Sequence, residues 1–123
     1  MAVAFSPYGK RLASGTSGFK IWDAQTGKEL LSSVSSDRIF ALAFNSDGKR
    51  LASTSSDGTV KLWDAQGGQE LLTFEHTGDR GISPDRGHES HNVAFSADGH
   101  RLASVLWDGT VRIWDATPPP EKP

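Results

Sequence analysis

One stretch of the sequence occurs three times, and this repeat constrains the fold more than any other feature. Leu51 to Ala65 reads LASTSSDGTVKLWDA. Leu102 to Ala116 matches it without a gap, and Leu12 to Ala24 matches it after the loss of two residues. Motifs that recur every ~20 to 50 residues are typical of proteins built by stacking one small structural unit. The repeat therefore predicts a modular architecture.

Each copy predicts two short β-strands joined by a tight turn. Leu, Thr, Val and Trp alternate with small or polar residues, as expected of strands. Asp57-Gly58 lies between the two strands of the second copy. Tight hairpin turns need positive φ, which glycine accepts without strain. Asp108-Gly109 and Ser17-Gly18 hold the same place in the other copies.

Further strands flank each copy. A short apolar strand and a turn that ends in glycine come before it, and the strands are Ala2 to Phe5, Ala41 to Phe44 and Asn92 to Phe95. A fourth strand follows the first two copies, at Lys28 to Ser33 and Gln69 to Phe74. Proline follows the third copy and has no N–H for a ladder, so we expect that unit to lack a fourth strand.

We expect the repeats to occupy residues 1–34, 35–75 and 91–116, followed by a Pro-rich tail at 117–123. Residues 76–90 then form a polar loop inserted between the second and third units. This loop carries one aliphatic residue, Ile82, so it has little to bury and should be dispensable to folding.

Composition argues against several functions. The chain has 13 Lys and Arg against 15 Asp and Glu, so it offers no basic surface for nucleic acid or an acidic membrane. It has no cysteine, which excludes disulfides and thiolate metal sites. No stretch approaches the ~20 apolar residues of a membrane span, and the N-terminus lacks the features of a signal peptide. We expect a cytoplasmic protein.

Four-stranded units whose third strand ends in Trp-Asp resemble the WD-repeat β-propeller family. The resemblance implies an all-β fold, a partial β-propeller of three four-stranded antiparallel blades, the third lacking its outer strand. Propellers usually close a ring of about 4 to 8 blades, so three blades should leave two open faces. We expect these faces to expose the tryptophans together with Leu12, Leu51 and Leu102.

The open faces predict association. We expect a homo-oligomer, with a dimer of six blades favoured over a trimer of nine, or a chain that is a fragment of a longer propeller holding the missing blades. Family resemblance also implies that the partners are other proteins and that the chain acts as a non-catalytic interaction module or scaffold.

The resemblance further implies a structural set of hydrogen-bonded residues in each blade: a turn Asp, a Ser or Thr of the second strand, the Trp of the third strand and a His before the first strand. By position, the second and third blades supply Asp57, Ser53 and Trp63, and Asp108, Ser104 and Trp114. Ser35 stands where the second blade's His would be, and His76 or His88 fits the third.

Members of the family usually bind partners at the end of the blade where the first strand begins and where the second and third strands turn. By position, the contacts there are Arg38, Phe40, Ser56, Glu89, His91 and Trp107. Trp107 replaces Ser56 of the second copy, at a tip where strand packing does not require an indole. Arg and large aromatics are common in binding hot spots, which favours this end as the docking face.

Two other residue patterns have simpler interpretations. Arg50 and Arg101 should lie across the hairpin from Asp64 and Asp115, as self-neutralising surface pairs at the opposite end of the blade. His88-Glu89-Ser90-His91 is one residue short of a His-Glu-x-x-His zinc motif. A metal-binding or enzymatic site in residues 76–91 is the alternative function. The sequence contains no recognisable nucleophile, phosphate-binding or dinucleotide motif, so we expect no catalysis and no cofactor.

Overall fold

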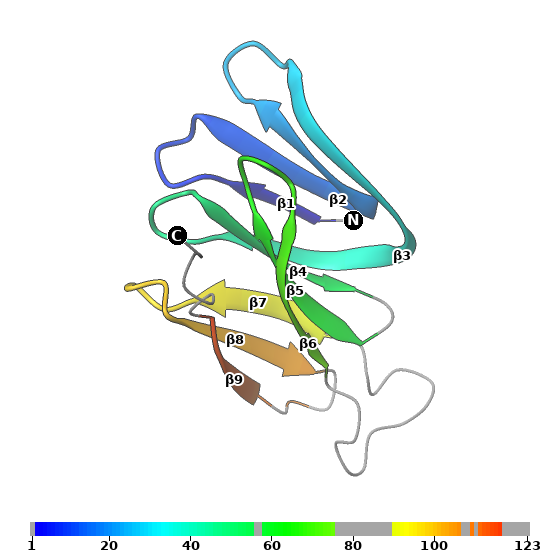
Figure 1. Ribbon diagram of the computed structural model, residues 1–123, viewed down its shortest axis with the longest axis vertical. Helices are drawn as coiled ribbons and strands as arrows, with labels where there is room; N and C mark the ends of the chain where they lie inside the picture. Colours follow the sequence, from blue (N-terminus) through cyan, green and yellow to red (C-terminus); the bar gives the residue numbers. More distant parts are fainter. Residues whose placement is uncertain (1, 56–57, 76–89, 107–108, 110, 117–123) are drawn as a thin grey trace, which may run out of the picture.

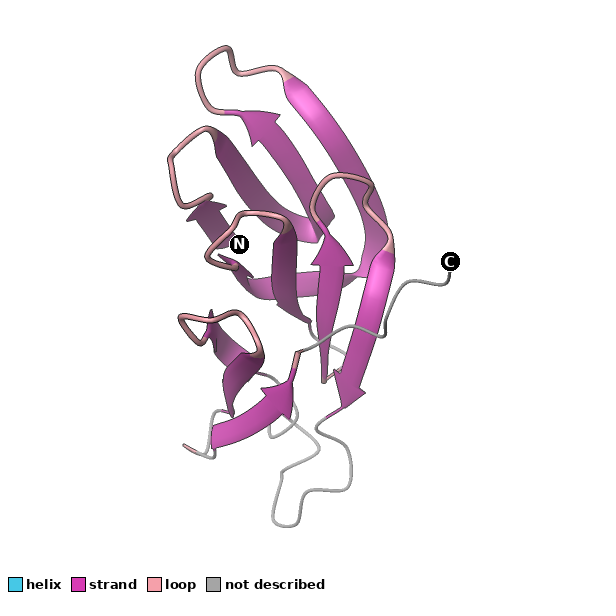
Figure 2. Ribbon diagram, turned by 60° about the vertical axis from the view of Figure 1, so that its left-hand side comes forward, coloured by secondary structure: helices cyan, strands magenta, loops and turns pink. Residues whose placement is uncertain are grey.

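The computed structural model describes residues 2–55, 58–75, 90–106, 109 and 111–116, and all regular structure in these residues is antiparallel β (Figures 1 and 2). β1 to β6 form a six-stranded sheet in chain order, and β7 to β9 form a three-stranded one. The expected all-β, antiparallel class is confirmed. The strands are β1 (Ala2–Phe5), β2 (Arg11–Asp23), β3 (Glu29–Phe44), β4 (Arg50–Ser55), β5 (Thr59–Asp64), β6 (Glu70–Glu75), β7 (Ser90–Phe95), β8 (Arg101–Leu106) and β9 (Val111–Asp115).

β2 contains a hairpin. The N–H of Ala24 donates to the carbonyl of Lys10 at 3.0 Å. The indole of Trp22 donates to the hydroxyl of Ser14 at 2.9 Å, although the two residues are eight positions apart. Eight residues of a straight strand would span ~26 Å, so the chain must reverse between them. Gly18, with φ of 90°, stands at the reversal, where the sequence predicts a turn.

β3 belongs to two successive blades. Its first part pairs with β2, from Trp22↔Glu29 to Gly18↔Val34. Its second part, residues 39–44, pairs with β4, and Figure 1 shows the strand bending sharply between the two parts. We therefore name the first blade as β1, β2 and residues 29–34, the second as residues 39–44 with β4 to β6, and the third as β7 to β9.

Two apolar interfaces join the three blades. Glycine allows a close approach at the first, because a Cβ on Gly15 would lie 2.7 Å from Cγ2 of Ile39. The residues of the first interface are Ala13, Phe19, Ile21, Ile39, Leu42, Leu51 and Ala65. Those of the second are Ala41, Ala52, Val60, Leu62, Val93, Leu102 and Ala116. Apolar burial of this kind is the main favourable contribution to folding, so each blade depends on its neighbour.

Aromatic contacts repeat at both interfaces. Trp63 of the second blade meets Phe19 of the first edge-on, with ring centroids 4.9 Å apart. Trp114 of the third blade stacks on Phe74 of the second at the same separation. Each of these tryptophans therefore faces the preceding blade.

The prediction of which residues the open faces expose was partly wrong. Leu51 and Leu102 are fully buried, because each faces the preceding blade. Leu12 is half-buried. Exposed apolar side chains gather instead on two edge strands: Val3 and Phe5 of β1 are each 65% exposed, and Val111 and Ile113 of β9 are 57% and 62% exposed.

The aligned residues of the inner blade explain this exposure. Leu42, which aligns with Val3, is buried, and so are Val60 and Leu62, which align with Val111 and Ile113. The same positions are thus covered where a neighbouring blade is present and open where none is.

Two predicted segments, the inserted loop and the tail, fall almost wholly outside the described residues. Only Ser90 of the loop is described, and it begins β7, one residue before the predicted start of the third unit. β9 is an edge strand of its sheet, and three strands of the third blade are described. No helix of membrane-spanning length and apolarity occurs in the part of the chain that the structure describes.

Candidate functional site

Sequence analysis favours one end of the blades for docking. Residues 39–44 of β3 and the strand β7 both begin at this end, which we call the bulge end. Arg38 lies there opposite Ser17, the residue before the reversal in β2. Ile39 pairs with Ser55, the last residue of β4. The bend in β3 thus brings the reversal in β2 and the end of β4 to the same edge (Figure 1).

A β-bulge displaces one residue at this end in both the second and the third blade. Pairing in the second blade steps from Ile39↔Ser55 to Ala41↔Thr54, which leaves Phe40 as the extra residue. In the third blade it steps from Ser90↔Leu106 to Asn92↔Val105, which leaves His91 as the extra residue. β-bulges redirect side chains and are common beside functional sites. Phe40 and His91 are aligned positions of the repeat.

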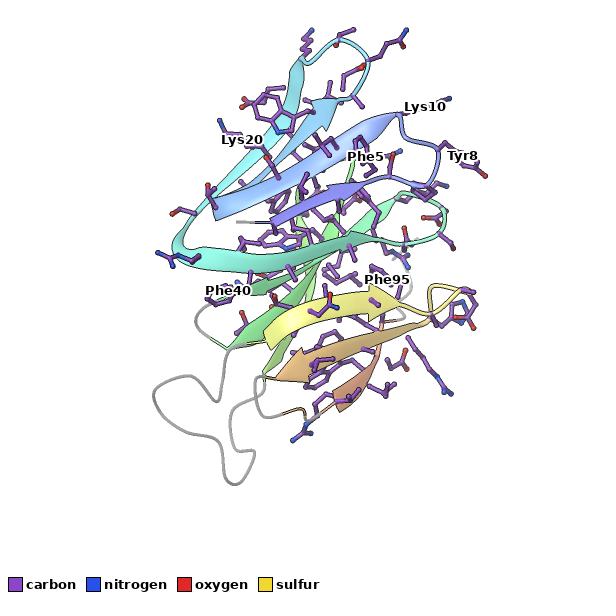
Figure 3. The ribbon with its side chains drawn as sticks, turned by 180° about the vertical axis from the view of Figure 1, so that it is seen from behind. Phe5, Tyr8, Lys10, Lys20, Phe40 and Phe95 are labelled. Carbon is purple, nitrogen blue, oxygen red and sulfur yellow. The ribbon has the colours of Figure 1, made fainter. Side chains whose placement is uncertain are left out.

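Phe40 is partly exposed and Arg38 is exposed. Figure 3 shows Phe40 at the bend of β3 and Tyr8 at the opposite end of the blades. A partly exposed aromatic two positions from an exposed arginine has the composition of a binding hot spot.

The second blade's turn at the bulge end is held closed. The hydroxyls of Ser55 and Thr59 are 3.0 Å apart, and the N–H of Gly58 donates to the carbonyl of Ser55 at 3.1 Å. Ser55, Gly58 and Thr59 are therefore held together by hydrogen bonds at this end of the blade. Five residues that the sequence predicts as partner contacts or members of a structural set lie outside the described residues. They are Ser56, Asp57, Glu89, Trp107 and Asp108.

Hydrogen bonds between a strand serine and the Trp-Asp tryptophan occur in all three blades. Trp63 donates to Ser53 and Trp114 donates to Ser104, each at 2.9 Å. The first blade has the same bond, from Trp22 to Ser14, although sequence reasoning assigned no structural set there. The first copy has Leu-Ala-Ser and Ile-Trp-Asp segments that align with those of the other copies, and this alignment could have predicted the bond.

The aspartate of Trp-Asp closes a turn at the opposite end of the blade. Asp64 accepts hydrogen bonds from the amides of Gln66 and Gly67, at 2.8 and 3.1 Å. Asp23 does the same with Gln25 and Thr26, and these amides lower the pKa of its carboxyl. Sequence reasoning missed this role.

Arg50 does lie opposite Asp64, and Arg101 opposite Asp115, as the hairpin register predicts. The ion pairs that the structure shows lie between the third and fourth strands of the first two blades. Lys20 pairs with Glu29 and Lys61 with Glu70, each at 2.9 Å.

Sequence reasoning offered a metal site as an alternative, and it falls on the inserted loop. His76, His88 and Glu89 are outside the described residues, and only the backbone of His91 is placed. Within the described part of the chain, no cluster of three or more His, Asp or Glu side chains is arranged to hold a metal ion.

Comparison with known proteins identifies the repeat. The family model described as "WD domain, G-beta repeat" matches residues 27–64 and 68–115. Nuclear distribution protein PAC1 of Fusarium vanettenii is 36% identical over 121 residues, which cover 94% of this chain and 27% of that protein. The small ribosomal subunit protein RACK1 of Neurospora crassa is 31% identical over 118 residues, which cover 92% of this chain and 36% of that protein.

A solved structure shows the same fold. The β-propeller domain of Cps50 (Swd1) from Myceliophteria thermophila superposes with a TM-score of 0.78 at 24% identity, covering 96% of this chain and 34% of that one. Periodic tryptophan protein 2 of Arabidopsis thaliana is 33% identical, and the match covers 94% of this chain but 12% of that protein. The chain thus spans about a third or less of each of these four proteins.

Proposed function

This chain belongs to the WD-repeat family, and from that premise we propose that it is a protein–protein interaction module or scaffold without catalytic activity of its own. The matched repeats cover most of the chain, and the blades have the fold of a propeller. Its partners in this proposal are other proteins, with neither nucleic acid nor membrane among them, and its compartment is the cytoplasm.

The docking face in this proposal is the bulge end. One observation carries it: the second and third blades both insert an extra residue, Phe40 or His91, at the same place. An irregularity that occurs in two copies of the repeat points to a role for the extra residue. The proposed contacts are Arg38, Phe40, Ser56, Glu89, His91 and Trp107.

The energetics of docking favour the aromatic residues of this set. A partly exposed phenylalanine on a rigid strand gains apolar burial on binding and loses little side-chain entropy. An arginine beside it adds donors for carboxylates or carbonyls. The serine and glutamate would then form the polar rim.

A photo-crosslinking experiment tests this face. A crosslinking phenylalanine analogue is placed at Phe40 or, as the control, at Tyr8, which is 85% exposed at the opposite end. We expect the captured protein to come from position 40. Once that protein is purified, Phe40→Ala and Trp107→Ala should each weaken its binding by more than ~1 kcal/mol, about fivefold, whereas Tyr8→Ala should not. If the partner were captured only from position 8, the docking face would lie at the end opposite to the bulge end, and the proposal would be wrong.

The two open faces support a second part of the proposal. In this proposal, a second copy of the chain or further blades of a longer protein cover both open faces. One face carries Val3 and Phe5, and the other carries Val111 and Ile113. A dimer is favoured because six blades fall within the usual ring size of about 4 to 8.

A further inference from the structure

The turn between the first and second strands differs in charge from blade to blade. In the first blade this turn, residues 6–11, reads Ser-Pro-Tyr-Gly-Lys-Arg and holds two cations and no acid. The aligned turns of the other two blades have aspartate in place of Tyr8, at Asp47 and Asp98. The first turn therefore lacks a negative charge that the other two copies carry.

Two exposed lysines hold the same place in the first two blades. The carbonyl of Lys10 accepts the N–H of Ala24 at 3.0 Å, and the carbonyl of Lys49 accepts the N–H of Ala65 at 2.8 Å. Neither lysine forms an ion pair with another described residue. An anion could therefore pair with either ammonium without breaking an ion pair within the described part of the chain.

A hollow lies between these two turns, and both lysines line it. The lining also includes Pro7, Tyr8, Gly48 and Gln66. A Cβ on Gly48 would lie 3.4 Å from Cδ of Pro7, so the turn of the second blade approaches that of the first closely. The hollow is thus formed by two consecutive blades, and all these residues lie between residues 6 and 66.

Two other charged residues of the lining already have partners. The amides of Thr26 and Gln25 chiefly lower the pKa of Asp23, and the charge of Arg11 contributes, so Arg11 lies near a carboxylate. Asp47 accepts the N–H of Lys49 at 2.8 Å. The local positive charge of the hollow therefore comes mainly from its two lysines.

The size and surface of the hollow favour side chains of a partner protein. Its volume is 190 Å³, below the ~300 to 1,000 Å³ of pockets that enclose small ligands. Tyr8 and Pro7 are both exposed and add apolar surface beside the lysines. Figure 3 shows Tyr8 and Lys10 extending from the same turn, at the end of the blades opposite to Phe40. A free anion would leave this apolar surface uncovered, whereas an aromatic residue flanked by carboxylates would cover it.

We propose that this hollow, which we call the turn groove, binds an acidic segment of a partner protein in which an aromatic residue lies between carboxylates. The carboxylates pair with Lys10 and Lys49, and the ring packs on Tyr8 and Pro7. The net charge of the chain is −2, so its overall field does not attract acidic peptides and binding depends on these local charges. The turn groove is separate from the bulge end and does not depend on docking there.

The junction of the second and third blades provides an internal comparison. By alignment, Asp47 stands there in place of Tyr8, and His100 in place of Lys49. These changes add a carboxylate and remove a lysine, which disfavours an acidic ligand. We therefore expect one site per chain.

The test uses the full chain and a fluorescent peptide, GEEFEEG, with both ends blocked. Fluorescence anisotropy should show saturable binding of one peptide per chain, and added salt should weaken it, as expected of exposed charges. The peptide GQQFQQG has the same size without carboxylates and should bind at least tenfold more weakly.

Single substitutions locate the site. Lys10→Glu and Lys49→Glu should each weaken binding of GEEFEEG at least fivefold. Tyr8→Asp, which gives the first turn the aspartate of the other copies, should do the same. Lys28→Glu is the charge-matched control, because Lys28 is an exposed lysine of the turn between β2 and β3 and does not line the groove. It should change binding less than twofold.

A charge swap tests the pairing directly. The double variant Lys10→Glu, Lys49→Glu should lose GEEFEEG and bind GKKFKKG, which the wild-type chain should bind at least tenfold more weakly. Recovery of binding also shows that the double variant is folded.

The same double variant separates this site from the bulge end. A partner captured by a crosslinker at position 40 should still be captured from the double variant, whereas a partner captured from position 8 should be lost. Failure at one end therefore leaves the other proposal standing.

Several results would overturn the proposal. They are the absence of saturable binding up to millimolar peptide, equal binding of GQQFQQG, or an equal loss in Lys28→Glu. Displacement of the peptide by inorganic phosphate or a short single-stranded oligonucleotide, at lower concentration than by unlabelled peptide, would assign the groove to a phosphate-bearing ligand. Binding seen only after removal of residues 117–123 would assign it to the chain's own tail, and binding seen only when light scattering shows dissociation of an oligomer would assign it to a second copy.

Discussion

Trp63 of the second blade packs edge-on against Phe19 of the first, with the ring centroids 4.9 Å apart and the planes at 63°. The same indole donates a hydrogen bond to Ser53, within its own blade, at 2.9 Å. One side chain therefore links two strands of a blade and connects that blade to its neighbour.

Trp63→Ala should lower the free energy of unfolding by roughly 3–5 kcal/mol, because it removes an interface aromatic and orphans the serine. Trp22→Ala is the matched control and should cost less, since no described blade packs in front of the first one. Urea denaturation followed by circular dichroism measures both. Equal losses at the two positions would mean that the contact with Phe19 contributes little.

Thr54→Val should leave stability unchanged or raise it by up to ~1 kcal/mol. Thr54 is fully buried, and its hydroxyl has no hydrogen-bond partner among the described residues, so a methyl group of similar size removes a desolvation cost. The third blade already has Val105 at the aligned position.

The neighbouring Ser53→Ala serves as the control for Thr54→Val. It should destabilise by about 1 kcal/mol, because Ser53 accepts the bond from Trp63. A marked loss in Thr54→Val would show that its hydroxyl is satisfied in solution.

Stability should fall in acid partly through Glu70. The hydroxyl of Thr73 and then the ammonium of Lys61 stabilise its carboxylate, so its pKa in the folded chain lies below the ordinary value of 4.5. A lowered pKa means that the contribution is complete above pH 4.5 and is lost as pH falls through the lower, folded value.

Thermal unfolding of the wild-type chain and of two variants, Glu70→Gln and Thr73→Val, between pH 3 and pH 7 measures this effect. Glu70→Gln should flatten the acid limb of stability against pH, and Thr73→Val should flatten it less, since Lys61 remains. An unchanged acid limb in Glu70→Gln would show that other carboxylates account for it.

The folded chain should not be an isolated monomer, because two edge strands expose apolar surface at Val3, Phe5, Val111 and Ile113. Multi-angle light scattering should give the mass of an oligomer, with a dimer favoured. Val3→Asp combined with Val111→Asp should shift it toward monomer, and Tyr8→Asp, in an exposed turn, should not. A compact wild-type monomer that unfolds cooperatively would contradict this prediction.

Local features of the fold could be predicted because their causes lie within a few residues. The turn glycines, the alternation of apolar residues and the Trp-Asp ends determine each hairpin and its register, as in Arg50↔Asp64. The proposed docking face is also placed by the repeat. The bulges at Phe40 and His91 could not be predicted from the repeat, because a bulge depends on how a strand enters its sheet and not on the identity of the extra residue.

The sequence by itself determined the repeat, the strands and the family. Only the tertiary structure decided which apolar residues are covered. Leu51 and Leu102 are buried while Val3 and Ile113 are exposed, although all four belong to apolar strands. The reason is physical: strand periodicity assigns a side chain to one face of a blade, but burial requires a neighbour on that face, and a neighbour is a property of the assembled chain.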